Sequence, residues 1–210
     1  MSERRPILLL NGVTREPVEA ALIEGVTLAE IQAADAAWLP FLRTVVQQAR
    51  LSGVPPEDLP EHGHWRWERK WRAATGASRF FGVESGGDIQ GLMAVRLDKT
   101  CRLPEQAGQP LVYVDYLAAA PWNDAPMLAR IAQAPRLSRV GSVLLQGAVH
   151  LSLSQGWRGR LGLHGLPQAA RFYREICGMT DLGTDAAYEG LPYFEMTVEQ
   201  AARLIGGGTQ

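Results

Sequence analysis

The part of the chain that most restricts its fold runs from Leu111 to His164 and contains two strand-like stretches separated by one helical stretch. Residues 111–117 are rich in β-branched and aromatic side chains, which favour a strand. Residues 141–155 repeat apolar side chains at helical spacing, and residues 160–164 again have a strand-like composition. A helix between two strands of one sheet forms a crossover, and crossovers join parallel strands. We therefore expect a parallel strand pair in an α/β sheet.

Further strands are predicted before and after the crossover. Residues 78–85 and 89–97 are strand-like and flank Gly86-Gly87-Asp88, a sequence typical of a hairpin turn. The other expected strands are a short one, or an arm, at 7–10 and two closing strands at 179–183 and 192–197. Together these stretches predict a sheet with both parallel and antiparallel pairs.

Local signals also mark the helices. Thr27 and Glu30 have the spacing of a capping box, in which each residue bonds the backbone of the other at a helix start. Pro40 interrupts the helical pattern that follows, so we expect a kink there or two helices that meet. The other stretches with helical character are 64–71, 127–133, 168–173 and 198–205.

Composition restricts the function. The chain has 210 residues, is 46% hydrophobic and 20% charged, and carries a formal net charge of −1. The near-neutral charge argues against a non-specific nucleic-acid binder, which needs a basic surface. Cys101 and Cys177 lack metal-ligand spacing and are expected to be buried free thiols. No apolar run has the length of a membrane span or signal peptide, so the cytoplasm is the expected location and no membrane partner is expected.

A candidate anion site lies where the central helix is expected to begin. Gly141 and Ser142 are small residues that allow close approach of a ligand to the backbone. The first N–H groups of a helix have no partner within the helix, and the helix dipole favours negative charge there. Such helix starts bind phosphate groups in many proteins. Arg136 and Arg139, just before the turn, could add charge-assisted hydrogen bonds.

This stretch resembles the acetyl-CoA-binding half of the GCN5-related N-acetyltransferase (GNAT) superfamily. The family's pyrophosphate loop reads Arg/Gln-x-x-Gly-x-Gly/Ala, and Arg136, Arg139 and Gly141 occupy its three defined positions. Arg139 therefore stands where the family has its first glycine. The later family pattern Asn-x-x-Ala-x-x-x-Tyr is matched at Ala169 and Tyr173. At its first position Leu166 replaces the asparagine, and the following glycine–aromatic pair appears as Gly178-Met179, one residue late.

The resemblance covers residues 111–196 and implies an α/β fold with a mixed central sheet of about six to seven strands flanked by helices. It implies one acetyltransferase-like domain over residues 1–210. Residues 1–77 would form its N-terminal helical, acceptor-side part, and residues 78–205 the sheet and the acetyl-CoA-binding part. The segment 124–135 is an insertion relative to compact family members, and it could shape the acceptor pocket or simply decorate the fold.

The resemblance also implies a function: an N-acetyltransferase in which a primary amine attacks acetyl-CoA directly in a ternary complex. The pantetheine arm would pair with the end of the central strand like an added strand. If the loop keeps the family's shape, a strained positive φ at Arg139 would have to be avoided by another conformation. The expected acetyl-CoA-binding residues are Leu117, Ala118, Ala119, Arg136, Arg139, Val140, Gly141 and Ser142.

The expected catalytic residues are Tyr173, Asp115 and His164, and Glu84 is a further candidate for the base. Tyr173 matches the family's general acid, since a phenol of pKa about 10 can protonate a departing thiolate of pKa about 8.5. Asp115 is the first candidate for the general base, because a carboxylate within an apolar strand is costly unless it is paired or functional. His164 at the end of the parallel strand is the second, and Glu84 is the third. Water alone could also relay the proton.

Other interpretations remain open at this point. Tyr173 could be a core tyrosine, and Asp115 could form a structural ion pair. Because Leu166 and Arg139 depart from the pattern, the chain could be a non-catalytic module that binds CoA or a protein partner. The basic and aromatic stretch 65–72 could bind nucleic acid or simply be an amphipathic helix. His62 and His64 lack a third ligand, so no metal is expected; the acceptor could be a small or peptide amine, and edge strands near the C-terminus offer a route to a homodimer.

Overall fold

One nine-stranded mixed sheet organises the chain, with the strand order β6-β1-β2-β3-β4-β5-β7-β9-β8. The structure is a computed structural model of the 210-residue chain, and it describes residues 2–56, 59 and 65–207. The strands are β1 (Glu3–Asn11), β2 (Pro17–Glu24), β3 (Ser78–Ser85), β4 (Asp88–Thr100), β5 (Pro110–Ala119), β6 (Leu137–Ser138), β7 (Leu161–His164), β8 (Thr180–Asp185) and β9 (Leu191–Met196). The expected fold class is confirmed, although the sheet has more strands than the predicted six to seven.

The described helices and strands belong to two compact units. The helices are α1 (Leu28–Leu51), α2 (Trp67–Arg72), α3 (Ala125–Ala129), α4 (Val140–Ser154) and α5 (Val198–Gly206). Unit 1 comprises residues 1–75, 80–92 and 117–144, and unit 2 comprises residues 76–79, 93–116 and 145–210. None of the described helices combines the length and the apolar character needed to cross a membrane.

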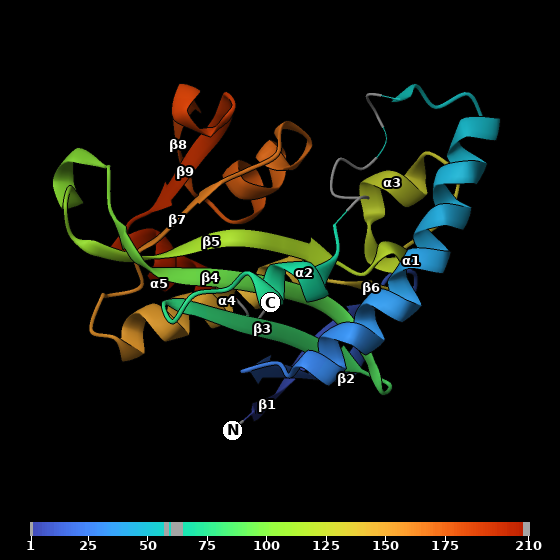
Figure 1. Ribbon diagram of the computed structural model, residues 1–210, viewed down its shortest axis with the longest axis horizontal. Helices are drawn as coiled ribbons and strands as arrows, with labels where there is room; N and C mark the ends of the chain where they lie inside the picture. Colours follow the sequence, from blue (N-terminus) through green and yellow to red (C-terminus); the bar gives the residue numbers. More distant parts are fainter. Residues whose placement is uncertain (1, 57–58, 60–64, 208–210) are drawn as a thin grey trace. The chain divides into compact units, whose positions relative to one another are not determined.

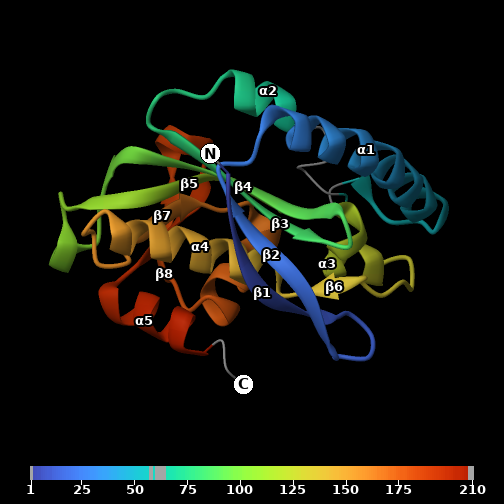
Figure 2. The ribbon, with the colours of Figure 1, turned by 90° about the horizontal axis from the view of Figure 1, so that it is seen from below.

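The additional strands come from an N-terminal hairpin in unit 1 that the sequence only partly indicated. The expected strand at 7–10 is the second half of β1, which pairs with β2 along most of its length. The other edge of β1 pairs with β6, where Leu10 is opposite Ser138 and Asn11 is opposite Leu137 (Figure 2). β6 was not predicted, because two residues are too few to show the alternating pattern of a strand. Only its pairing with β1 identifies it as a strand.

α1 begins as predicted, with the Thr27 side chain and the Glu30 side chain each bonding the backbone of the other residue. It continues through Pro40 as one helix, so the expectation of two meeting helices is wrong. A proline inside a helix removes one backbone donor, and Pro40 is exposed, where water can satisfy the freed carbonyl. The C-terminal half of α1 packs against α3, with Val45 and Ala49 contacting Met127 and Leu128 in one apolar cluster (Figure 1).

Unit 2 contains the predicted parallel pair. β5 and β7 run parallel, with Val112, Tyr113 and Val114 opposite Leu161, Gly162 and Leu163. β9 pairs antiparallel with β7, and β8 pairs with β9, which confirms both closing strands. Cys101 and Cys177 are buried free thiols, as expected, and burial raises the pKa of each thiol to about 12.

The helix expected over 168–173 is not a regular α-helix. It consists of a 3₁₀ turn at Pro167–Ala169 and a π-turn at Phe172–Ile176. Gly165 precedes this segment and lies directly against Tyr173, where a Cβ atom would come within 2.8 Å of the ring. Pro167 favours a short turn at this point because its ring fixes φ and its nitrogen carries no donor. The irregular helix therefore holds the Tyr173 ring against the backbone of unit 2.

Candidate active site

A buried polar clamp holds both ends of the segment that precedes α4. The Asn123 side chain accepts a hydrogen bond from the Leu137 N–H at 2.9 Å and donates one to Gln90 Oε1 at 2.9 Å. Trp122 Nε1 donates to the same Gln90 oxygen at 2.8 Å, and the Trp122 carbonyl accepts from the Arg136 N–H at 2.9 Å. These hydrogen bonds hold the two ends of the 124–135 insertion together. The chain therefore continues from a fixed position at Arg136.

The N-terminal hairpin supports the same loop from its other side. The Gly12 N–H donates to the Arg136 carbonyl at 2.9 Å. A Cβ atom on Gly12 would lie 1.8 Å from the Pro135 carbonyl oxygen, so only glycine allows this approach. Arg15, in the turn of the hairpin, donates to the Ser138 hydroxyl at 2.7 Å. The guanidinium of Arg136 lies 5.0 Å from the centre of the Trp122 ring, within the range of a cation–π contact.

Arg139 adopts a left-handed backbone conformation, with φ of 74°, immediately before α4. The expectation that an arginine here must avoid positive φ is therefore wrong. Its carbonyl accepts the hydrogen bond of the Val143 N–H at 3.0 Å, which starts the helical bonding. The N–H groups of Val140, Gly141 and Ser142 precede this bond, so they have no acceptor within the helix. Helix starts with such N–H groups bind anions in many proteins, and the predicted phosphate site at Val140–Ser142 stays a prediction.

β5 extends beyond the residues that it pairs with β7. The pairing between β5 and β7 ends at Val114 and Leu163, whereas β5 continues to Ala119. The predicted pantetheine-binding residues Leu117, Ala118 and Ala119 lie in this extension. An unpaired strand edge offers backbone donors and acceptors to an added strand or an amide-containing chain.

In unit 2, His164 is held by contacts on both ring nitrogens. Nδ1 lies 2.6 Å from the Tyr113 hydroxyl and Nε2 lies 3.0 Å from Asp185 Oδ2, while the ring stacks on Tyr188 at 3.8 Å. Burial lowers the pKa of His164 below its usual value, although the Asp185 carboxylate acts in the opposite direction. Hydrogen bonds from Arg102 and His164 lower the pKa of Asp185 to about 2. This arrangement fits a neutral imidazole that accepts from Tyr113 and donates to Asp185.

Asp115 and Tyr173 lie in contrasting surroundings within unit 2. Asp115 is partly exposed, and its carboxylate lies 3.9 Å from Arg96 Nε. Tyr173 is buried, and its ring packs against Phe172 and Phe194. Burial raises the pKa of Tyr173, which keeps its hydroxyl protonated near neutral pH. In the described part of the chain, no hydrogen bond to this hydroxyl is found.

The structure places the sequence-predicted residues in two groups. All of the residues expected to bind acetyl-CoA belong to unit 1, whereas Tyr173, Asp115 and His164 belong to unit 2. Glu84 is in unit 1, where it bonds Arg4 at 3.3 Å. His62 and His64 lie outside the described residues. Over residues 2–56, 59 and 65–207, no three His, Cys, Asp or Glu side chains gather in a way that could hold a metal ion.

No protein-family model matches the sequence, and no curated protein matches it significantly. Solved structures do match the fold. The PaiA N-acetyltransferase from Thermoplasma acidophilum, in complex with coenzyme A, aligns with a TM-score of 0.50 and 11% identity over 84% of this chain and 98% of its own. The chain has a GNAT-like fold.

Two further solved structures align with lower scores. An acetyltransferase from Thermus thermophilus aligns with a TM-score of 0.43 and 14% identity over 83% of this chain and 96% of its own. A mutant of the toxin AtaT, bound to the C-terminus of its antitoxin AtaR, aligns with a TM-score of 0.45 and 14% identity over 69% of this chain and 80% of its own.

Several residues around the loop were not predicted from the sequence. Asn123, Gln90 and Gly12 brace the loop in this GNAT-like fold, and Arg15 adds a guanidinium beside it. Asn11-Gly12 is a typical turn sequence, but the backbone that it contacts, around Pro135, is distant in the chain. Gln90 is a buried polar residue within an apolar strand, and this is the one signal that could have singled it out.

Proposed function

We propose that the chain is an acetyl-CoA-dependent N-acetyltransferase that transfers the acyl group to a primary amine by direct attack in a ternary complex. The observation that carries this proposal is the left-handed conformation of Arg139 before α4. A non-glycine residue in that region costs about 1–2 kcal/mol. This conformation supports a phosphate-binding loop at the position where the family has glycine, and Arg139 would add a guanidinium to it.

Binding of the diphosphate would use the start of α4. The N–H groups of Val140, Gly141 and Ser142 would donate to phosphate oxygens, and the helix dipole would favour their charge. Arg136 and Arg139 would add charge-assisted hydrogen bonds, which are about twice as strong as neutral ones. Because the clamp at Asn123 and the hairpin at Gly12 fix the loop, little conformational entropy would be lost on binding.

Placement of the thioester would use the end of β5, beyond its last pair with β7. The amide groups of the pantetheine arm would pair with the backbone of Leu117–Ala119, as an added strand pairs with a sheet edge. Ala118 and Ala119 have small side chains near the end of the strand, which leaves room for the arm. A carbonyl held by strand-type hydrogen bonds has a fixed orientation, which favours attack by an amine from one side.

The chemistry itself needs one base and one acid. The neutral amine nitrogen would attack the thioester carbonyl carbon, the C–N bond would form and the C–S bond would break, releasing CoA as a thiolate. Asp115 would accept the proton lost by the amine, directly or through water, and Tyr173 would protonate the thiolate. His164 has partners on both ring nitrogens, so it would act only through the Tyr113 hydroxyl.

We also propose that residues 1–210 act as one catalytic domain, with residues 1–77 contributing to acceptor binding and residues 78–205 to acetyl-CoA binding. A CoA-binding module without turnover is the second candidate. It is favoured by Tyr173, whose ring is buried among aromatic side chains, and by His164, whose ring nitrogens are both engaged. Under that alternative, acetyl-CoA would bind but no acyl group would leave.

Release of free thiol from acetyl-CoA tests the proposal. A panel of primary amines is added to the full chain with acetyl-CoA, and thiol is measured with a colorimetric reagent. We expect thiol release that depends on both the amine and the protein. Acetyl-CoA binding without thiol release from any amine would instead support the non-catalytic module.

A further inference from the structure

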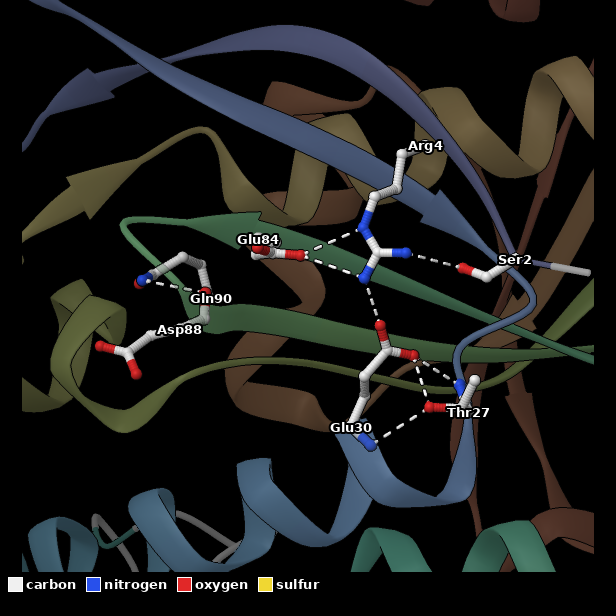
Figure 3. A network of polar contacts seen from close by, with 7 residues as sticks. All are labelled: Ser2, Arg4, Thr27, Glu30, Glu84, Asp88 and Gln90. Carbon is white, nitrogen blue, oxygen red and sulfur yellow. Dashed lines mark hydrogen bonds and ion pairs between the residues drawn. The ribbon is translucent and has the colours of Figure 1, made fainter.

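A cavity of about 240 Å³ lies in unit 1 and is lined by residues of α1, β1 and the turn between β3 and β4. It was not indicated by the sequence. Figure 3 shows four of its lining residues, Arg4, Glu30, Glu84 and Asp88, within a network of polar contacts. Its walls are formed by Arg4, Glu30, Ala33, Ala34, Ala37, Trp38, Glu84, Gly87, Asp88, Ile89 and Trp122.

Carboxylates outnumber the single guanidinium in this cavity. Arg4 bridges Glu30 and Glu84, and the bond between Arg4 and Glu84 measures 3.3 Å. Burial alone would raise the pKa of Glu30, but hydrogen bonds from Thr27 and Arg4 outweigh it and lower that pKa. Asp88 is the third carboxylate, and no side-chain hydrogen bond or ion pair reaches it from the described residues. The walls therefore carry a net negative charge.

The remaining walls are aromatic rings and small side chains. Trp38 Nε1 donates to the Ile89 carbonyl at 3.0 Å, and Trp122 Nε1 donates to Gln90 Oε1 at 2.8 Å. Both indole N–H groups thus already have hydrogen-bond acceptors. A ligand in the cavity would therefore contact the carbon atoms and π-electrons of the rings rather than their N–H groups. Aromatic faces attract organic cations. Three alanines of α1 leave space where larger side chains would fill the cavity.

The cavity adjoins the end of β5, where the proposed thioester would lie. Ile89 and Trp122 line it, and the carbonyl of the next residue, Gln90, accepts a hydrogen bond from the Ala120 N–H at 2.8 Å. A Cβ atom on Gly91 would lie 3.3 Å from the Ala118 carbonyl oxygen. One wall of the cavity is therefore continuous with the strand end that we assign to the pantetheine arm.

We propose that this cavity binds a small aliphatic ammonium ion, and that the same molecule is the acceptor of the acyl group once its reacting nitrogen has lost a proton. Only the acceptor role rests on the proposed function, whereas binding of the cation does not. The carboxylates Glu84 and Asp88 would hold the positive nitrogen, and the Trp38 and Trp122 rings would contact its carbon chain. Its volume of about 240 Å³ lies below the roughly 300–1,000 Å³ of pockets that hold drug-sized ligands. This size fits a short amine or diamine better than a peptide or an antibiotic.

Calorimetric titration of the full chain with 1,4-diaminobutane tests the proposal, with and without CoA present. Butane-1,4-diol has the same length and shape but no charge, so it serves as the control ligand. We expect saturable binding of the diamine in at least one of the two conditions and none of the diol. Equal binding of both ligands, or no diamine binding in either condition, would overturn the proposal.

Two variants locate the binding in this cavity. Ala37 lines the cavity but is exposed, so Ala37→Leu fills it without overpacking the core; Ala36→Leu on the same helix is the matched control. We expect Ala37→Leu to weaken diamine binding at least about tenfold and Ala36→Leu to change it less than about twofold. Asp88→Lys, at an exposed turn, should weaken it by about tenfold. Unchanged diamine affinity in both cavity variants, with unchanged melting temperature, would place the cation elsewhere.

Acetyl-CoA affinity, measured in the same samples, separates this inference from the proposed function. Acetyl-CoA binding without diamine binding would overturn the cation site and leave the proposed transferase standing. Diamine binding in the cavity without acetyl-CoA binding would retain the cation site and overturn its role as an acceptor site.

Discussion

The side-chain oxygen of Asn123 accepts a hydrogen bond from the backbone N–H of Leu137, fourteen residues along the chain and 2.9 Å away. This bond closes the inserted segment before the proposed phosphate loop. The Asn123 amide nitrogen donates to Gln90 at the same time, so one buried side chain joins the insertion to β4. The loop can therefore keep its position although the insertion precedes it.

Removal of this clamp should lower both stability and acetyl-CoA affinity. Asn123→Ala leaves the buried Leu137 N–H without an acceptor, which costs about 1–3 kcal/mol in the free energy of unfolding. The loop would also lose its fixed position, so acetyl-CoA should bind more weakly. Denaturant unfolding and calorimetry measure the two effects, with Gln133→Ala, an exposed change within the insertion, as the control. A stable variant with unchanged affinity would show that the clamp does not position the loop.

Arg139→Gly should change stability and affinity in opposite directions. Glycine removes the strain of positive φ and should raise the free energy of unfolding by about 0.5–1 kcal/mol. Loss of the guanidinium should weaken acetyl-CoA binding roughly fivefold. Arg158→Gly is a matched control, because Arg158 is exposed and also has positive φ, at 59°. Arg158→Gly should stabilise the protein similarly and leave acetyl-CoA affinity unchanged; equal loss of affinity in both variants would contradict the role of Arg139.

Tyr173→Phe should lower the rate of acyl transfer and retain acetyl-CoA binding. General acid catalysis contributes about 10²–10⁴-fold, and water could replace part of it. We therefore expect a fall in kcat of at least about tenfold, with an unchanged melting temperature in the presence of acetyl-CoA. Tyr188→Phe, which keeps the ring that stacks on His164, is the control. Full activity of Tyr173→Phe would make Tyr173 a core residue only.

Acid should destabilise the protein in two steps. Because the pKa of His164 is lower in the folded state than in the unfolded chain, the unfolded chain binds more protons below about pH 6.5, and stability falls there as pH decreases. The lowered pKa of Asp185 gives a second loss from about pH 4 down to about pH 2. His164→Gln should flatten the first step in a series of melting curves between pH 8 and 5. His150→Gln, at an exposed position on α4, should leave that step unchanged; an identical slope in His164→Gln would contradict the assignment.

The features predicted correctly are those that depend on neighbours in the sequence. The capping box at Thr27 and Glu30, the glycine turn between β3 and β4 and the crossover from β5 to β7 all follow from local spacing. The pairing of β1 with β6 and the clamp at Asn123 join residues that are far apart in the chain. No local pattern encodes them, so they were not predicted.

The conformation of Arg139 was predicted wrongly for a related reason. Local sterics disfavour positive φ for arginine, but the hairpin and the clamp fix the chain on one side of this residue and α4 fixes it on the other. The cavity beside α1 was also absent from the sequence interpretation, because its walls come from several distant segments. Thus the order of the longer elements from β3 onward was predictable from the sequence, whereas β2, β6 and the side-chain arrangement of the site required the structure.

Acetyl-CoA binding to the wild type and to Gly141→Glu tests the central claim most directly. The substitution places bulk and negative charge at the proposed diphosphate site, whereas Gly76→Glu, where a side chain meets open space, is the matched control. We predict that acetyl-CoA raises the melting temperature of the wild type and of Gly76→Glu, since a ligand that binds only the folded state stabilises it, and that ATP has little effect. Gly141→Glu should show no such rise. An equal rise in all three proteins, or none in the wild type at millimolar acetyl-CoA, would contradict the account.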